Sequence, residues 1–316
     1  MILNGMGGIF MEHIVKNIIK NYYRTEAKTI TALGGGFYGR VFLAELVKSP
    51  YKIVLKVYLI NGLAHKEKQQ LEILSKYAII KMPKVYFTHQ CDVSIPYDVL
   101  GMEYLEGINA GAQKQVNEKY LDHIANKMVD NLIAYHSIEH EEGFGEIGAE
   151  TFIKDWREYY RIKVKDIYEK ATRMFQNGKL NETIFEIIDR AYRFYDKIFY
   201  LPITKACLTH GDYNTWNIML NKELTDVAAV IDPFNCCWAD PEIDLYQLSN
   251  ANGKYFSLME LYKKKRQLSE NFELKNSFYE LFTEIMHFYD AGVDISKSNI
   301  LSEAMHLKEQ MLLHCI

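Results

Sequence analysis

Three polar residues in the second half of the chain have the types and spacing that phosphoryl transfer requires. Asp212 lies in the run His210-Gly211-Asp212-Tyr213-Asn214-Thr215-Trp216-Asn217, and Asp232 follows fifteen residues after Asn217. Such chemistry needs a carboxylate that orients an acceptor hydroxyl, and oxygen ligands that hold Mg²⁺ against phosphates. Asp212 is the candidate for the first task, and Asn217 with Asp232 for the second. The alternative is that Asp212 and Asn217 only cap a loop.

A glycine-rich run lies near the start of the chain. Gly34, Gly36 and Gly39 satisfy the pattern G-x-G-x-x-G, and glycine lets backbone N–H groups approach a phosphate without a Cβ in the way. Dinucleotide-binding folds place this pattern between a strand and a helix, whereas kinases place it between two strands. The residues Val41 to Leu46 are typical of a strand, which favours the kinase arrangement. An ordinary glycine-rich hairpin turn is the alternative.

Lys56 stands in the middle of the apolar strand-like run Ile53 to Tyr58. A lysine in such a position must either pair or extend its ammonium to solvent. Glu67 is the preferred partner, because it shares a helix face with apolar residues four and seven positions later. Glu72 is the competing candidate. A Lys56–Glu67 pair would hold the lysine against nucleotide phosphates as in kinases, and a half-exposed lysine with a solvated glutamate is the alternative.

These groups need a β-rich part followed by a helical part to position them. Before Gly107 we expect one helix at 12–22, strands, and a second helix at 64–77. After it we expect long amphipathic helices, interrupted by a β-rich island at 206–232. The expected division is an N-terminal helix at 1–27, a nucleotide-binding lobe at 28–102, a connector at 103–107 and a helical lobe at 108–316. The strands of the first lobe are expected at 29–33, 39–46, 51–59, 84–88 and 97–104, and the helices of the second at 115–137, 152–175, 182–200 and beyond 240.

The composition is that of an ordinary globular protein. Of 316 residues, 48% are hydrophobic and 25% charged, and this length suggests two domains or lobes. Lys and Arg number 37 against 41 Asp and Glu, for a net charge of −4, so no nucleic-acid partner is expected. We expect no membrane association or signal peptide either. Five cysteines, two of them adjacent, are typical of reduced thiols in a cytoplasmic protein; the oligomeric state is left open.

The order of these motifs over residues 28 to 290 resembles the aminoglycoside phosphotransferase/choline kinase-type family of small-molecule kinases. The resemblance implies an α+β, two-lobed protein kinase-like fold, with a small β-rich N-lobe and a larger, mainly helical C-lobe. It also implies an ATP (or GTP) co-substrate, Mg²⁺, and a small-molecule hydroxyl as acceptor. The motifs that carry it are Gly34–Val41, Lys56, Glu67, Met82–Val85, Met102–Gly107, Tyr135–Ser137, the His210–Asn217 run, Asp232 and Asp240–Leu245.

The resemblance assigns roles to four further residues. The connector backbone around Glu103 and Tyr104 would receive the adenine edge. His210 would support the catalytic loop structurally, and Asp244 would anchor it.

Two departures from the family's pattern lie beside the expected acceptor site. Trp216 stands where the family often has a small residue, and Pro233-Phe234 replaces a frequent aromatic–acidic pair. Neither change removes a reactive group. Because both lie beside the acceptor, the resemblance transfers no particular substrate.

A protein acceptor is excluded by the length of one segment. Only Pro233 to Ala239 separate Asp232 from Asp240, and no A-P-E motif follows, whereas a protein kinase carries its activation loop there. The expected acceptor is therefore an aminoglycoside, a choline-like amino alcohol or a sugar-like molecule. A non-catalytic kinase-like scaffold or spore-coat-type structural protein is the alternative, and the complete set of candidate catalytic residues argues against it.

Two groups of residues are candidates for lining the acceptor pocket. The aromatic residues Trp156, Tyr159, Tyr160 and Trp238 could bind a cationic or sugar-like acceptor, but helical spacing favours a core position for them. The acidic run from Glu139 to Glu146 could attract a polyamine, although a solvated loop is preferred.

Overall fold

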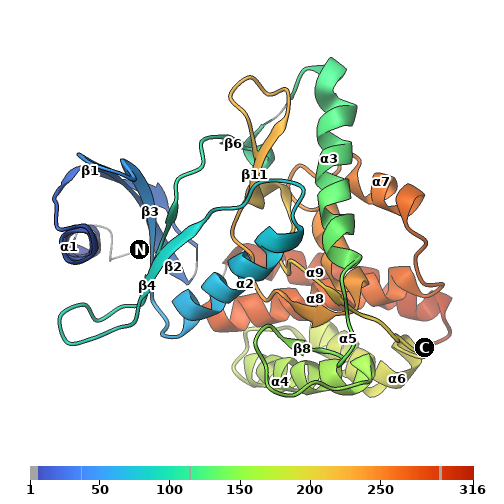
Figure 1. Ribbon diagram of the computed structural model, residues 1–316. Coiled ribbons are helices and arrows are strands. Elements are labelled where there is room, and N and C mark those ends of the chain that lie inside the picture. The colour runs from blue at the N-terminus through green and yellow to red at the C-terminus, as the bar shows by residue number, and fades with distance from the viewer. Residues whose placement is uncertain (1–5, 37, 114, 292–293) are drawn as a thin grey trace.

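The computed structural model describes residues 6–36, 38–113, 115–291 and 294–316 (Figure 1). The fold is α+β with two lobes: an antiparallel sheet forms the first, and helices with two small sheets form the second. Figure 1 shows the sheet and the helical part side by side, with α2 (Leu63–Tyr77) between them. Within these described residues, no helix is long and apolar enough to cross a membrane.

The N-lobe sheet has the strand order β1-β2-β3-β5-β4. All of its pairings are antiparallel, and Lys56 on the central strand β3 lies opposite Val41 on one side and Leu100 on the other. The strands are β1 (Ala27–Gly34), β2 (Gly39–Leu46), β3 (Lys52–Tyr58), β4 (Val85–His89) and β5 (Val99–Glu103).

The two faces of this sheet have different partners. Along β3, Ile53, Leu55 and Val57 are buried in a cluster with apolar side chains of α1 (Met6–Tyr23). Because side chains alternate along a strand, Lys56 extends from the opposite face. The N-terminal helix thus covers one face and leaves the other to the cleft.

Helix α2 runs along the boundary between the lobes. Its buried residues are Ala64, Glu67, Gln70, Leu71 and Leu74, the i, i+3, i+4, i+7 stripe expected of a helix with one buried face. Leu71 and Leu74 belong to the same core cluster as the helical lobe. The expected range of 64–77 agrees with the helix to within one residue.

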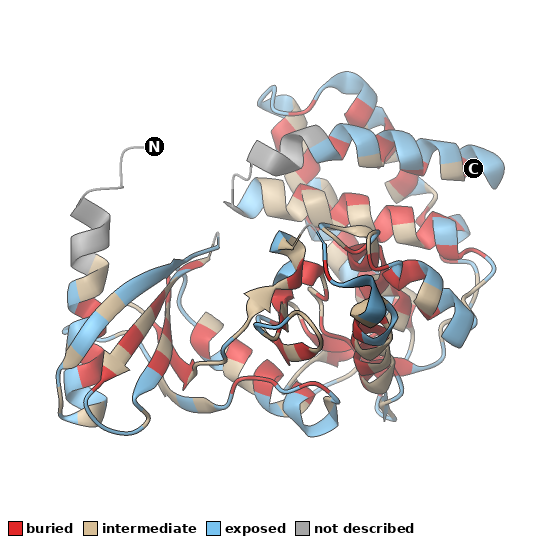
Figure 2. Cartoon of the chain, turned by 90° about the horizontal axis from the view of Figure 1, so that it is seen from above, coloured by how far each residue is buried: buried red, intermediate tan, exposed pale blue. Residues whose placement is uncertain are grey.

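The C-lobe helices surround a core rich in aromatic side chains. Figure 2 shows its buried residues on the inward faces of the helices and its exposed residues on the outward faces. The helical elements are α3 (Glu118–His136), α4 (Trp156–Gln176), α5 (Glu182–Arg193), α6 (Tyr195–Ile198), the 3-10 segment η3 (Pro241–Ser249), α7 (Leu258–Lys265), α8 (Phe272–Ala291) and α9 (Asp294–Leu313).

Two of the predicted helices were wrong in extent. The helix expected at 182–200 ends at Arg193, because Phe194, with a φ of −97° and a ψ of 17°, leaves the helical region before the short α6 begins. The helix expected from Phe152 begins only at Trp156, because the Asp155 side chain caps it by accepting from the Arg157 N–H. Ile153, before this cap, instead pairs with Phe144.

Short strands in the C-lobe position the polar residues of the cleft. One small sheet has the order β11-β10-β6, with β10 (Ile218–Leu220), β11 (Val227–Val230) and β6 (Ile108–Asn109); β6 is followed by the 3-10 turn η1 (Ala110–Ala112). Ile218 pairs with Val230 in the β10–β11 hairpin. Asn217 and Asp232 therefore both lie at the open end of the hairpin, one beside each strand. A second sheet has the order β7-β9-β12-β8, with β7 (Glu139–His140), β9 (Ala206–Leu208), β12 (Cys237–Ala239) and β8 (Gly145–Glu146).

Candidate active site

A loop from His210 to the 3-10 turn η2 (Thr215–Asn217) connects β9 to β10. Gly211 adopts a φ of +80°, a conformation that favours glycine. A Cβ at this position would also overlap the backbone carbonyl of Phe234. The glycine therefore allows the loop to lie directly against the segment that follows Asp232.

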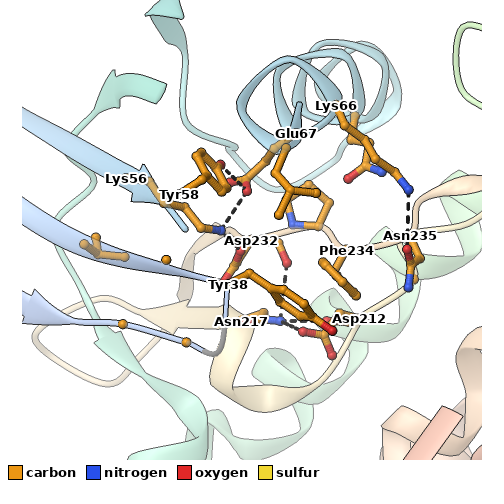
Figure 3. Close-up of a pocket in the computed structure, with 18 of the residues that line it drawn as sticks. Tyr38, Lys56, Tyr58, Lys66, Glu67, Asp212, Asn217, Asp232, Phe234 and Asn235 are labelled. Atoms are coloured by element: carbon orange, nitrogen blue, oxygen red, sulfur yellow. Dashed lines mark hydrogen bonds and ion pairs between the residues drawn. The ribbon is translucent and has the colours of Figure 1, made fainter. Parts of the chain in front are cut away.

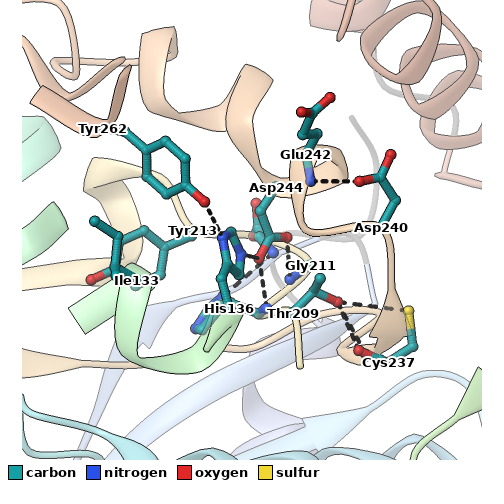
Figure 4. A network of polar contacts seen from close by, with 12 residues as sticks. Ile133, His136, Thr209, Gly211, Tyr213, Cys237, Asp240, Glu242, Asp244 and Tyr262 are labelled. Atoms are coloured by element: carbon teal, nitrogen blue, oxygen red, sulfur yellow. Dashed lines mark hydrogen bonds and ion pairs between the residues drawn. The ribbon is translucent and has the colours of Figure 1, made fainter. Parts of the chain in front are cut away.

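Asp244 holds this loop from behind (Figure 4). Its Oδ2 accepts from the His210 N–H and its Oδ1 from the Gly211 N–H, both at 2.8 Å. The Nε2 of His136 lies 3.2 Å from the same carboxylate, while its Nδ1 lies 2.8 Å from the Tyr262 hydroxyl. All these side chains are buried, so the loop is fixed by a polar network on its inner side.

His210 itself is buried and its imidazole is neutral near pH 7. Burial lowers the pKa of His210 to about 4, against the opposing effect of Asp244. Its Nδ1 lies 3.4 Å from the Asp212 backbone nitrogen, which can donate to it. His210 therefore lies beneath the loop that carries Asp212, and its supporting role stays a prediction.

Asp212 is held by two amides. The Asn217 Nδ2 donates to the Asp212 Oδ2 at 2.7 Å and to its carbonyl at 2.9 Å, and the Asn214 Nδ2 donates to its Oδ1 at 2.6 Å. Desolvation, and then the charge of Asp232, raise the pKa of Asp212 to about 7. Asn214 was not singled out from the sequence, although its oxygen also accepts from the Trp216 N–H as a turn-capping residue does.

Lys56 connects the two lobes through carboxylates (Figure 3). Its Nζ lies 2.7 Å from the Glu67 Oε2 and also forms an ion pair with Asp232. Burial opposes the charge, but Glu67 and Asp232 outweigh it and raise the pKa of Lys56. The structure places Glu67 at this lysine, whereas Glu72 lies near Lys68 at 3.9 Å.

Tyr58 is a site residue that sequence reasoning missed. Its hydroxyl donates to the Glu67 Oε2 at 2.6 Å and is buried. Tyr58 lies two residues after Lys56 on β3, so it belongs to the same strand end. It fixes the glutamate that in turn fixes the lysine.

The oxygen groups at this end of the cleft fit a magnesium ion. Because the Asn217 amide nitrogen donates to Asp212, the amide oxygen is left for another partner. The Asp232 side chain is 47% exposed at a φ of +56°. The described residues hold no cluster of three or more His, Cys, Asp or Glu suited to a metal. Mg²⁺ typically binds through one or two carboxylates plus substrate phosphates, so this donor set suffices.

Two adjoining cavities occupy the cleft between the lobes. One of about 550 Å³ is lined by Met102, Glu103, Tyr104 and Leu105 of the connector. The backbone N–H of Glu103 already donates to the Lys84 carbonyl, so Glu103 cannot use it to bind a base. The other, of about 510 Å³, is lined by the candidate catalytic residues and the segment after Asp232. Lys56, Glu67, Asn217 and Asp232 line both.

The three glycines of the G-x-G-x-x-G pattern are glycine for different structural reasons. Gly34 has a φ of +129°, and a Cβ at Gly39 would lie 2.8 Å from the Val57 carbonyl oxygen. A Cβ at Gly36 would meet nothing within 4 Å, although Gly36 lines both cavities. Backbone conformation therefore explains Gly34, and packing explains Gly39. Neither requires glycine at position 36, where the absence of a Cβ leaves room for a ligand to approach closely.

Tyr38 and Phe234 face each other across the cleft. Their rings stack with centroids 5.0 Å apart, and Phe234 in turn lies 6.2 Å from His287 of α8. Phe234 is one of the residues at which the chain departs from the family's pattern. The stack joins the glycine-rich loop to the segment that follows Asp232.

Most of the aromatic residues that are candidates for the acceptor pocket are buried in the core. Trp156 and Tyr160 are 1% and 3% exposed and stack at 5.1 Å, and Trp238 stacks on His140 at 4.6 Å. Tyr159 donates instead to Glu146 at 3.1 Å. Trp156 and Tyr160 nonetheless line a third cavity of about 360 Å³ beside the catalytic loop.

A two-lobed α+β fold with a glycine-rich loop, a lysine–glutamate pair and an Asp-Asn-Asp set at the cleft defines a protein kinase-like phosphotransferase. A sequence model of the phosphotransferase enzyme family matches residues 29–266. The chain belongs to this family.

The more similar proteins of known sequence or structure are distant. The chain is 20% identical to the uncharacterized protein YcbJ of Escherichia coli (strain K12) over 246 residues, covering 77% of this chain and 81% of that protein. A putative fructosamine-3-kinase from Thermobifida fusca YX-ER1 has a TM-score of 0.67 at 16% identity, over 93% of this chain and 98% of the other. The GDP and kanamycin complex of APH(2")-IIia has a TM-score of 0.68 at 14% identity, over 95% and 98%. At these identities the structures establish the fold alone.

Proposed function

We propose that this protein is a cytoplasmic small-molecule kinase that transfers the γ-phosphoryl group of ATP or GTP, with Mg²⁺, to a hydroxyl group. The acceptor would be an aminoglycoside, a choline-like amino alcohol or a sugar-like molecule. The observation that carries the proposal is the convergence of Lys56 with Asp232, 176 residues away, at one cleft beside Asp212. Five free cysteines are in keeping with a reducing compartment.

The chain's own residues supply three of the tasks that transfer requires. Asp212, oriented by its two amide donors, would align the acceptor hydroxyl and accept its proton late, since the transition state of such transfers is loose. Lys56 would stabilise negative charge on the phosphates. The glycine-rich loop would bring backbone N–H groups to them.

Asn217 and Asp232 would hold the magnesium ion. Bound there, the ion would neutralise phosphate charge during transfer. The hairpin β10–β11 separates these two residues and fixes the distance between them. Asp244 and His210 would act indirectly, by holding the loop that carries Asp212 in place.

The choice of nucleotide is part of the proposal. Among the similar structures, APH(2")-IIia is a GDP complex and APH(2'')-Ib is ADP-bound. Neither identity is high enough to transfer the preference. Both nucleotides therefore belong in every assay.

The test combines nucleotide binding with acceptor turnover. We expect Mg²⁺-dependent thermal stabilisation by ATP or GTP, and acceptor-dependent release of the nucleoside diphosphate for at least one small alcohol. The acceptor panel comprises aminoglycosides, choline, ethanolamine, homoserine, methylthioribose and amino sugars. Absence of both nucleotide stabilisation and slow nucleotide hydrolysis would contradict the proposal and leave a non-catalytic kinase-like scaffold.

A further inference from the structure

The third cavity adjoins the phosphate end of the cleft. It lies among α4, η3 and α8, and it shares Gly211 and Asn235 with the cavity that contains Asp212. Its volume is about 360 Å³, near the lower end of the range for small-molecule sites. An acceptor whose hydroxyl lies at Asp212 can therefore place the rest of its structure here.

Two lysines from different lobes meet where these cavities adjoin. Lys66 of α2 lines the Asp212 cavity and Lys163 of α4 lines the third one. The Lys163 Nζ lies 2.6 Å from the Glu146 Oε1, and the Lys66 Nζ lies 3.3 Å from the Glu146 Oε2. Lys66 also lies 3.5 Å from the Asn235 side-chain oxygen (Figure 3). One carboxylate thus serves two ammonium groups.

The other carboxylates that line the third cavity are Asp166 and Asp244, and both have partners of their own. Asp166 is paired with Lys170 at 3.0 Å, and Asp244 accepts from the backbone N–H groups of His210 and Gly211. Burial disfavours the charge of Lys163, yet the Glu146 carboxylate beside its ammonium group opposes this and the pKa of Lys163 is raised, so the ammonium stays protonated. Lys66, Lys163 and Glu146 together carry one positive charge.

Both lysines remain accessible to a ligand. Their side chains are 41% and 35% exposed, against 13% for Lys56. An ion pair between partly exposed side chains contributes less to stability than a fully buried one. The pair is therefore free to exchange part of its contact with Glu146 for contact with a ligand.

We infer that the acceptor is a small alcohol that carries an anionic group, a carboxylate or a phosphate, bound between Lys66 and Lys163. This inference rests on the proposed kinase function and narrows its acceptor to a sugar-like or other small alcohol with an anionic group, in place of a cationic aminoglycoside or choline-like amino alcohol. The acceptor hydroxyl lies at Asp212. Its oxygen forms the new bond to phosphorus while the bond to the nucleoside diphosphate breaks, and Asp212 accepts the hydroxyl proton late in this step. The two ammonium groups also offset repulsion between an anionic acceptor and the nucleotide phosphates.

Matched acceptors test the inference on the intact protein. Each set has one carbon skeleton with a different end group: gluconate, glucitol and glucamine; and glycerate, glycerol and aminopropanediol. Glycerol phosphate separates a phosphate from a carboxylate preference. We expect kcat/KM for the anionic members to exceed that of the neutral ones by about tenfold or more. Where no member turns over, dissociation constants measured with the nucleoside diphosphate present decide in the same way.

Two variants with opposite expected effects separate ligand binding from a merely structural bridge. Lys163→Met lowers the kcat/KM ratio of anionic over neutral acceptor by about tenfold. Glu146→Gln raises that ratio, because it removes the competing carboxylate. Lys163→Arg keeps the preference, and Lys165→Met, at an exposed position on the same helix, leaves it unchanged. A structural bridge alone predicts that the first two variants act in the same direction.

The outcomes distinguish this inference from the proposed function. Preference for amines or neutral alcohols, or Lys163→Met and Glu146→Gln changing the ratio in the same direction, overturns the inference while the kinase function stands. If the unmodified protein shows no Mg²⁺-dependent nucleotide binding, the kinase function itself is overturned.

Discussion

The two ends of the cleft are built in different ways. At the nucleotide end, Lys56 is 13% exposed and binds two carboxylates, Glu67 and Asp232. At the acceptor end, Lys66 and Lys163 are 41% and 35% exposed and share one carboxylate. Residues that perform a fixed chemical task need to be held rigidly by their neighbours, and Lys56 is the more firmly held. This difference fits the roles that we propose, catalysis for the first set and acceptor choice for the second.

The largest expected effect is at Asp212, where the two ends meet. Asp212→Ala removes the proton acceptor, so kcat should fall by about 10²–10⁴-fold, measured as acceptor-dependent release of nucleoside diphosphate. Asp226→Asn in the turn between β10 and β11 is the matched control. Turnover of a true substrate that survives Asp212→Ala intact would show that the role is misassigned.

A slightly smaller effect is expected at Lys56. Lys56→Met removes a fixed positive charge from the phosphates, and kcat/KM should fall by about 10²–10³-fold, measured with saturating Mg²⁺. Lys52→Met, on the same strand but 46% exposed and paired with Glu45, should leave activity within about twofold. Equal losses in the two variants would mean that the strand, and not the Lys56 charge, is what matters.

The nucleotide end could be predicted from the sequence because its signals are local. The glycine pattern, a lysine at a strand position among apolar residues, and an asparagine and aspartate flanking one hairpin are each visible within one short stretch of chain. The α2 stripe distinguished Glu67 from Glu72 by helical periodicity. Tyr58 escaped notice because a tyrosine at a strand end is common and its contact with Glu67 depends on how α2 docks.

The acceptor end could not be predicted, because its residues come from distant elements. Lys66, Glu146 and Lys163 lie on α2, β8 and α4, and each alone is typical of a solvated position. Glu146 belongs to an acidic run that the sequence pattern predicts to be a solvated loop.

The end of α5 at Arg193 is also absent from the sequence pattern, because tertiary packing overrides a continuous apolar pattern there.

Both ends depend on the network behind the loop. Asp244→Ala leaves the buried His210 and Gly211 N–H groups without their acceptor, which should lower the free energy of unfolding by about 2–4 kcal/mol, measured by urea denaturation. Asp244→Asn keeps one acceptor oxygen and should cost less. If neither variant changes the free energy of unfolding, the loop is held by contacts other than the Asp244 network of Figure 4.

The smallest effect concerns pH and the helix that lines the acceptor end. Glu280 of α8 faces Glu303 of α9, with Glu284 and Lys254 nearby; burial and then Glu303 raise its pKa to about 9. A raised carboxyl pKa means that the folded chain binds more protons than the unfolded one between about pH 4.5 and 9. Its contribution to stability therefore falls as pH rises through that window. Tyr246 also lies close enough to feel this charge.

Glu280→Gln checks that sign. The variant should flatten the decline of Tm between pH 5 and pH 9, with little change in nucleotide binding, since Glu280 lies outside both cavities of the nucleotide cleft. A Tm profile identical to that of the unmodified protein would show that Glu280 titrates as an ordinary carboxyl.

The proposed kinase function is tested most directly by the nucleotide affinity of Asp232→Asn, measured with and without Mg²⁺ and compared with that of the unmodified protein. A magnesium-dependent nucleotide site at Asn217 and Asp232 requires that Mg²⁺ strengthens nucleotide binding to the unmodified protein and that most of this gain disappears in the variant. An unchanged Mg²⁺ dependence in Asp232→Asn would contradict the proposed site.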